Sequence, residues 1–152
     1  MAGNVLLDAV YGTLTSAFVT ADLDAKTTGS YALGSGAGAT IDNTTALKLW
    51  IDVLINLGSI TPTGAAYVTL STLRSMDGTT FEDPQTAIAP NAGTPTWSQG
   101  VSTAAAAKVL IIRQILVPPG KCKLLFGNFT NVTLATGGNT IKYWLSGYQD
   151  NG

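Results

Sequence analysis

The strongest constraint on the fold is the presence of an apolar residue at every second position from 47 to 57. In a β-strand, successive side chains point to opposite faces, whereas a helix would spread the same residues around its whole surface. The alternation therefore predicts a β-strand with one continuous apolar face. The residues of that face are Leu47, Leu49, Ile51, Val53, Ile55 and Leu57.

Further strand-like stretches follow, separated by turn residues such as Asp77-Gly78 and Pro118-Pro119-Gly120. No stretch shows the apolar stripe of a helix. Short strands at regular spacing predict an all-β fold, an antiparallel β-sandwich with jelly-roll-like connections, in one domain overall. The further strands are expected at 66–76, 79–82, 108–117, 121–126 and 140–148.

Two segments depart from this pattern. Residues 1–45 are rich in glycine, threonine and alanine, and we expect an extended N-terminal arm with short strands there, ahead of a sandwich over 46–152. Residues 83–107 contain three prolines and four consecutive alanines, and no charge from Pro84 to Ala107. Because a solvated disordered linker is normally charged, this long segment predicts a loop that lies against a surface.

The residue types that enzymes use are scarce. The 152 residues include no histidine, one cysteine, nine carboxylates and eight basic residues, which excludes Ser-His-Asp and Cys-His catalytic sets. Asp77, Glu82 and Asp83 are the carboxylates that could form a glycosidase pair or a calcium site. Asp77 is better explained by its turn, and the other two by an exposed strand end. We expect no catalysis, no cofactor and no metal.

The charged residues also limit the class of partner. The basic residues are scattered, whereas a nucleic-acid surface needs a cluster, so we expect no nucleic-acid binding. No apolar run reaches the length of a membrane span, and the first residues lack a basic secretory signal. Charged residues form only 11% of the chain, less than half the usual share of about 25%. A surface with so little charge predicts an obligate oligomer or a component of a larger assembly, the alternative being a low-charge monomer.

Two stretches are apolar on both faces, although a sandwich strand needs only one apolar face. After Lys108, residues 108–117 are apolar on each side except at Arg113 and Gln114, and Trp50 and Leu54 lie opposite the apolar side of 47–57. The second face is either covered by the arm or the long loop, or buried against a sister subunit. Tryptophans often anchor such interfaces, which makes Trp50, Trp97 and Trp144 candidates.

The segment from Leu70 to Asp83, with its Ser-Met-Asp-Gly-Thr-Thr-Phe core, resembles a pattern in small virion proteins of tailed bacteriophages. The run from Leu116 to Lys123 resembles the second half of that pattern. The resemblance implies a capsid cement (decoration) protein: a β-rich homotrimer on the outer surface of the virion that bridges major capsid protein subunits without catalysis. It also implies synthesis in the host cytoplasm without a signal peptide.

Capsid or subunit contacts are expected in the N-terminal segment, in the long loop and at the tryptophans. Two other functions stay open: a carbohydrate-binding β-sandwich module of a phage head or tail fibre, with exposed aromatic rings stacked on sugar, and a tail-tube or connector component, which would form rings or tubes. The candidate contact residues are Leu6, Leu7, Tyr11, Leu14, Trp50, Ile88, Pro90, Pro95, Trp97 and Trp144.

Overall fold

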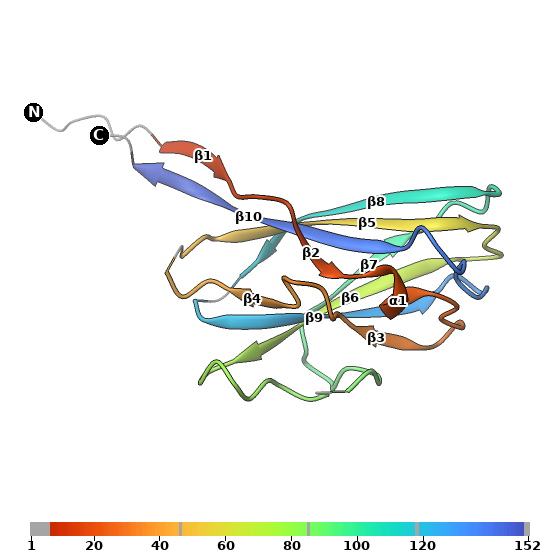
Figure 1. Cartoon of the computed structure of the whole chain (residues 1–152), viewed down its shortest axis with the longest axis horizontal. Coiled ribbons are helices and arrows are strands. Elements are labelled where there is room, and N and C mark those ends of the chain that lie inside the picture. Colours follow the sequence, from red (N-terminus) through yellow and green to blue (C-terminus); the bar gives the residue numbers. More distant parts are fainter. Residues whose placement is uncertain (1–6, 46, 85, 118, 151–152) are drawn as a thin grey trace, which may run out of the picture.

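A computed structural model describes residues 7–45, 47–84, 86–117 and 119–150, and they form two antiparallel β-sheets packed face to face (Figure 1). The predicted all-β antiparallel sandwich is therefore confirmed. In sheet A, β10 pairs β1 and β2 along one edge and β5 along the other, and β5 pairs β8. The strands of sheet A are β1 (Leu7–Tyr11), β2 (Thr15–Phe18), β5 (Trp50–Ile60), β8 (Ala106–Leu116) and β10 (Thr140–Asp150).

Sheet B has the same plan. In it, β9 pairs β3 and β4 along one edge and β6 along the other, and β6 pairs β7. A helix of one turn, α1 (Thr20–Leu23), links β2 to β3. The strands of sheet B are β3 (Tyr31–Leu33), β4 (Thr40–Asp42), β6 (Tyr67–Ser75), β7 (Thr96–Gly100) and β9 (Lys121–Phe129).

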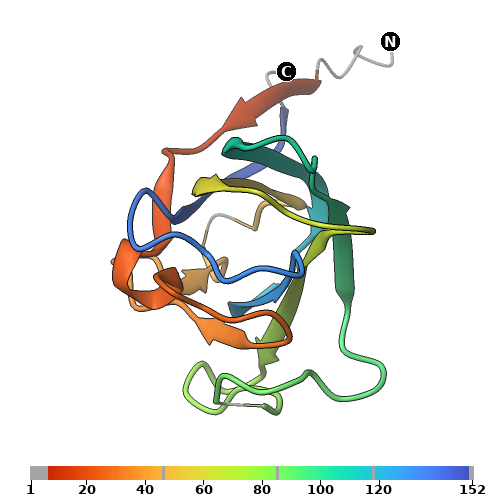
Figure 2. The same cartoon turned by 90° about the vertical axis from the view of Figure 1, so that its right-hand side faces the viewer.

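The core lies between the two sheets, as the end view in Figure 2 shows. Alternation in β5 directs Ile51, Val53 and Ile55 inward, and each is fully buried. Phe18 and Phe126 close the core from β2 and β9, also without exposure to solvent. Burying a large apolar side chain is worth about 1.5–3 kcal/mol, so burial of these three side chains is the main contribution to the orientation of the strand.

The long alternating strand begins later than the sequence predicted, at Trp50 instead of Leu47, and it ends at Ile60. The backbone of Leu47 has a φ of 42°, which an extended strand cannot include. The buried side chain of Asn43 also binds both the N–H and the carbonyl of Lys48, at 2.7 and 2.8 Å. These bonds fold the chain into a compact loop ahead of the strand.

Two other expectations need correction, and a third is not confirmed. The predicted strand at 79–82 is only an isolated bridge between Ser75 and Phe81. The segment 83–107 is not one loop, because β7 lies within it and pairs with β6, and β8 begins at Ala106. The described residues before 45 contribute four strands to the two sheets, so an extended arm is not confirmed. The division into 1–45 and 46–152 stays a prediction.

Buried asparagine side chains hold the connections at one end of the sandwich. Asn128 donates to the carbonyls of Lys26 and Val132, at 2.8 and 2.9 Å, and accepts from the amide and the hydroxyl of Thr130. Its carboxamide therefore uses both donors and its oxygen accepts twice, as burial of such a group requires. Asn139 likewise joins Gly58, Asp24 and Ala135. These side-chain hydrogen bonds satisfy backbone groups in the connections, which pair with no strand there.

Candidate interaction surface

The outer faces of the two sheets differ in whether the chain covers them. On sheet B, Leu73 and Leu125 point away from the core, yet both are fully buried. Phe81 is buried as well, and the amine of Lys123 lies 4.3 Å from the centre of its ring. The loop after β6 therefore covers this part of sheet B, at the bottom of Figure 1.

The outer face of sheet A carries apolar side chains that stay accessible. In antiparallel pairs, residues directly opposite one another share a face, which places Trp50, Leu54 and Trp144 on this side. All three are partly exposed. Ile111, opposite Leu54, is 41% exposed, and the nearby Val109 is 67% exposed. The same rule places Lys142 and Asp52 on this side, opposite Leu54 and Trp144. We call this side the sheet A outer face. Its accessible apolar side chains, on a face that is normally polar, fit burial by another molecule.

Strand β8 forms the edge of sheet A, and in the described residues it pairs only with β5. A bulge interrupts the pairing, because Ile51 pairs Ile115 while Val53 pairs Ile112. Gln114, in the bulge, has a φ of 56° and donates its N–H to the buried carboxylate of Asp52 at 2.6 Å. The carboxylate thus holds the bulge in place.

A groove of about 560 Å³ opens where the edges of the two sheets meet. It forms because β7 pairs β6 only as far as Thr96, opposite Ser71, whereas β8 continues to Leu116. Pro95 and Trp97 line it from sheet B, and Leu49 and Leu116 from sheet A. The volume lies in the range of about 300–1,000 Å³ typical of ligand pockets. We call this feature the β7–β8 groove.

Arg74 brings the only charge among the residues that line the β7–β8 groove. The backbone N–H of Arg74 donates to the carboxylate of Glu82 at 3.1 Å, and the backbone carbonyl of Arg74 accepts from the amide of Glu82 at 2.8 Å. In the described part of the chain, no carboxylate lies within ion-pair distance of its guanidinium. The groove therefore combines apolar walls with one uncompensated positive charge. Sequence reasoning missed Arg74, because a single basic residue in a strand carries no recognisable pattern.

The predicted contact residues fall into separate places. Pro95 and Trp97 meet in the β7–β8 groove, and the other two tryptophans lie on the sheet A outer face. Leu14 is exposed between β1 and β2; Ile88 is exposed and Pro90 partly exposed in the loop before β7. The structure does not unite these contacts into one surface. Leu6 lies outside the described residues; Leu7 and Tyr11 pair with Asp150 and Ser146 in β10, and their side chains are not described.

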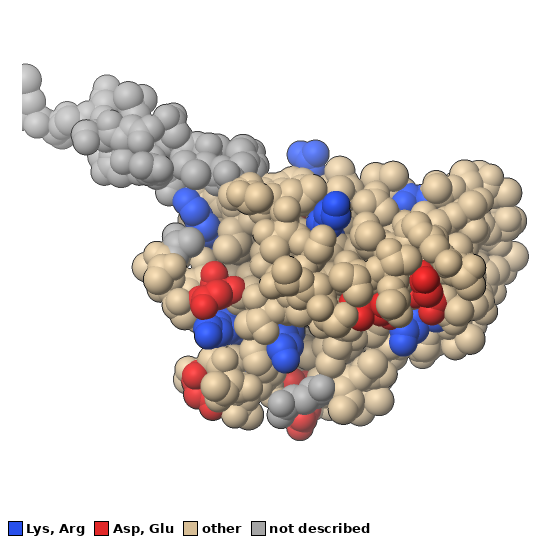
Figure 3. Space-filling view, in the orientation of Figure 1, with Lys and Arg blue, Asp and Glu red and all other residues tan. Residues whose placement is uncertain are grey.

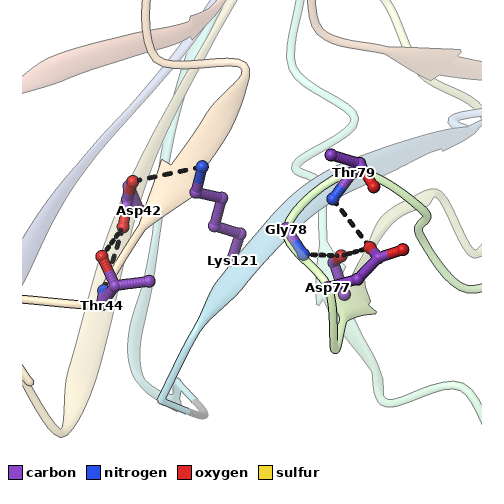
Figure 4. A network of polar contacts seen from close by, with 7 residues as sticks. Asp42, Thr44, Asp77, Gly78, Thr79 and Lys121 are labelled. Atoms are coloured by element: carbon purple, nitrogen blue, oxygen red, sulfur yellow. Dashed lines mark hydrogen bonds and ion pairs between the residues drawn. The ribbon is translucent and has the colours of Figure 1, made fainter.

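Two of the three carboxylates that were candidates for catalysis or calcium binding, Asp77 and Glu82, accept hydrogen bonds from backbone amides. Asp77 accepts hydrogen bonds from the amides of Thr80 and Thr79, at 2.6 and 2.8 Å, and these bonds hold the pKa of its carboxyl far below the usual range. Figure 4 shows the bond from Thr79. A further carboxylate in Figure 4, that of Asp42, accepts from the amide and the hydroxyl of Thr44 and forms an ion pair with Lys121 at 3.6 Å. Among the described residues, no three potential metal-ligating side chains gather at one point.

The thiol of Cys122 is enclosed in the core between β4 and β6. Burial raises its pKa to about 12, so the reactive thiolate is not populated near neutral pH. The face of the molecule in Figure 3 shows charged side chains separated by wide uncharged areas. The buried thiol is therefore not a reactive nucleophile near neutral pH, and the face drawn in Figure 3 shows no concentrated patch of charge.

Comparison with known proteins adds no identification. Within the described residues, no helix has the length and apolar character needed to cross a membrane. No known protein family matches the chain, and no curated protein sequence matches it either.

Proposed function

We propose that this chain is a non-catalytic structural protein that binds the outside of an assembled viral capsid and stabilises it by bridging major capsid protein subunits. It would act as a homo-oligomer, with a trimer as the expected form. The observation that carries the proposal is the sheet A outer face, where Val109 and Ile111 are 67% and 41% exposed beside Trp50 and Trp144. Such a face is costly to leave in water and suits contact with neighbouring subunits.

The strand order supports the same proposal. Along the chain, β2 lies in sheet A, β3 and β4 in sheet B, β5 in sheet A, β6 and β7 in sheet B, and the last three strands alternate again. This alternation between the two sheets supports the expected jelly-roll connections. Jelly rolls occur in viral capsid proteins and in lectins, so the fold favours both leading candidates without deciding between them.

The mechanism would be mass action. A protein that binds the assembled shell but not its free subunits lowers the free energy of the shell by an amount that grows with its concentration relative to Kd. No reacting group is needed for this, which agrees with the scarcity of nucleophiles and bases in the sequence. Low surface charge also avoids the repulsion that many adjacent copies would otherwise produce.

The experiment is a count of copies in particles. Particles purified from the cells that produce the chain would be analysed by quantitative mass spectrometry against the major capsid protein. A fixed ratio that corresponds to hundreds of copies per particle is the expected result. A handful of copies would instead indicate a fibre or connector component, and absence from the particles would contradict the proposal.

One observation favours the carbohydrate-binding alternative. Tyr67, which is 39% exposed, stacks on Phe129 with ring centres 4.9 Å apart, and Tyr31 meets the same ring edge-on at 5.7 Å. This cluster on sheet B offers an aromatic surface on which a sugar ring could stack. Glycan-array binding that Tyr67→Ala abolishes would favour this function. An empty array combined with binding to assembled heads would favour the capsid function.

A further inference from the structure

We propose that the β7–β8 groove is a docking site for an extended segment of a partner protein, apolar in sequence and carrying one carboxylate that pairs with Arg74. The proposal goes beyond the function proposed above, because it concerns the β7–β8 groove, which adjoins the sheet A outer face only at Leu116, opposite Trp50. It also holds for a partner protein of any origin.

The shape and lining of the groove indicate an apolar occupant. Its walls are Leu49, Pro95, Trp97 and Leu116, with Val117 and Pro119 at one end, and its volume is about 560 Å³. Leu49 and Leu116 are 48% and 67% exposed, although each continues an apolar strand pattern. Removing such side chains from water contributes about 25 cal/mol for each Å² buried.

The charge of Arg74 specifies the polar part of the occupant. The carboxylate of Glu82 accepts from the backbone N–H of Arg74, and in the described residues no carboxylate lies within ion-pair distance of the guanidinium. A guanidinium beside apolar walls forms stronger and more directional bonds with a carboxylate than it does in open water. The occupant therefore carries an acidic side chain or a C-terminal carboxylate among apolar residues.

The open edge of β8 indicates an extended conformation. This edge borders the groove at Leu116 and pairs no other strand in the described part of the chain. Its outward amides and carbonyls are free to add a further strand, the mode by which many domains bind peptide segments. The bulge at Gln114 interrupts this edge, and only Ile115 and Leu116 of β8 follow it. The segment would therefore pair over these two residues and lie in the groove along the rest of its length.

The test is a selection of random displayed peptides on the full-length chain, followed by fluorescence anisotropy with the enriched peptides. We expect enriched peptides with one Asp or Glu between apolar residues. Arg74→Gln should weaken their binding about tenfold or more. Arg74→Glu should change the selected residue from acidic to Lys or Arg. The matched control is Arg113→Gln, an exposed arginine on β8 that does not line the groove and whose loss should leave affinity unchanged.

A second variant, Leu116→Asp, places a charge in the groove at an exposed position that the core does not need, and it should also abolish binding. Thermal melts would confirm that each variant is folded. The proposal is overturned if no peptide is enriched, or if the peptides bind Arg74→Gln and Leu116→Asp as tightly as the original chain. It is also overturned if the chain self-associates and Arg74→Glu returns it to a monomer, because the occupant would then be a second copy.

Discussion

Replacing Asn128 with alanine should destabilise the fold strongly, because one buried side chain joins three separate points of the backbone. The side chain is fully buried and makes four hydrogen bonds, two donated to the carbonyls of Lys26 and Val132 and two accepted from Thr130. At about 1 kcal/mol for each bond, the loss would reach about 4 kcal/mol if every partner were left alone.

The partners are not all left alone, which lowers that figure. The carbonyl of Lys26 also accepts from the amide of Leu134 at 2.9 Å, and the carbonyl of Val132 also accepts from the hydroxyl of Thr130 at 3.1 Å. The buried N–H of Thr130 is the group that loses its acceptor, at a cost of about 1–3 kcal/mol. We therefore expect a loss of about 3 kcal/mol, or about 6–12 °C in Tm for a chain of this size.

The assay is thermal unfolding followed by circular dichroism, checked by urea unfolding. The matched control is Asn131→Gly, since Asn131 is exposed, makes one bond to Thr63 at 2.6 Å and has a φ of 62° that glycine accepts without strain. The control should cost less than about 1 kcal/mol. A Tm for Asn128→Ala within about 2 °C of the original chain would refute the reasoning, because on this scale that shift is worth about 1 kcal/mol or less.

Three further predictions concern the close backbone contact at Gly34, the buried thiol of Cys122 and the carboxylate of Asp77. Gly34→Ala should destabilise the chain by several kcal/mol in a urea titration, because the new Cβ would lie 2.1 Å from the carbonyl oxygen of Ala17. Gly100→Ala, which meets nothing within 4 Å, should be nearly neutral. Cys122 should resist alkylation at pH 8 in the folded chain, since burial raises its pKa to about 12, and should react once urea unfolds the protein. The pKa of Asp77 lies below its ordinary value of 3.8, so the stability that it contributes is present above that pH and is lost as the pH falls further. Asp77→Asn should therefore show a smaller fall in Tm between pH 5 and pH 2 than the original chain, and an equal fall would contradict this role.

The sequence predicted the sandwich because alternation is a local signal. Burial of Ile51, Val53 and Ile55 on one face is set by the side-chain period of two, whichever strands are neighbours. The start of that strand was wrong by three residues, since it depends on the positive φ of Leu47 and on the bonds from Asn43. Short strands such as β7 were missed because five residues with one aromatic group show no alternation.

The candidate surfaces were predictable only in part. Trp50, Trp144 and Trp97 were selected as aromatic anchors, and the structure places the first two on one outer face and the third in the β7–β8 groove. The groove itself could not be predicted, since it arises where the pairing of β7 with β6 stops at Thr96 while β8 continues to Leu116. That difference is a property of long-range register, which no local pattern in the sequence specifies.

The central claim is that the sheet A outer face is buried by neighbouring molecules, and sedimentation velocity of the purified chain over a wide concentration range tests it most directly. We predict oligomers for the original chain and a monomer with an unchanged melt for Ile111→Asp, since this side chain is 41% exposed and lies outside the core. The control is Met76→Asp, which charges a fully exposed position directly after β6 of sheet B and should leave the oligomers intact. A chain that stays monomeric at the highest concentration, or oligomers that survive Ile111→Asp, would contradict the claim.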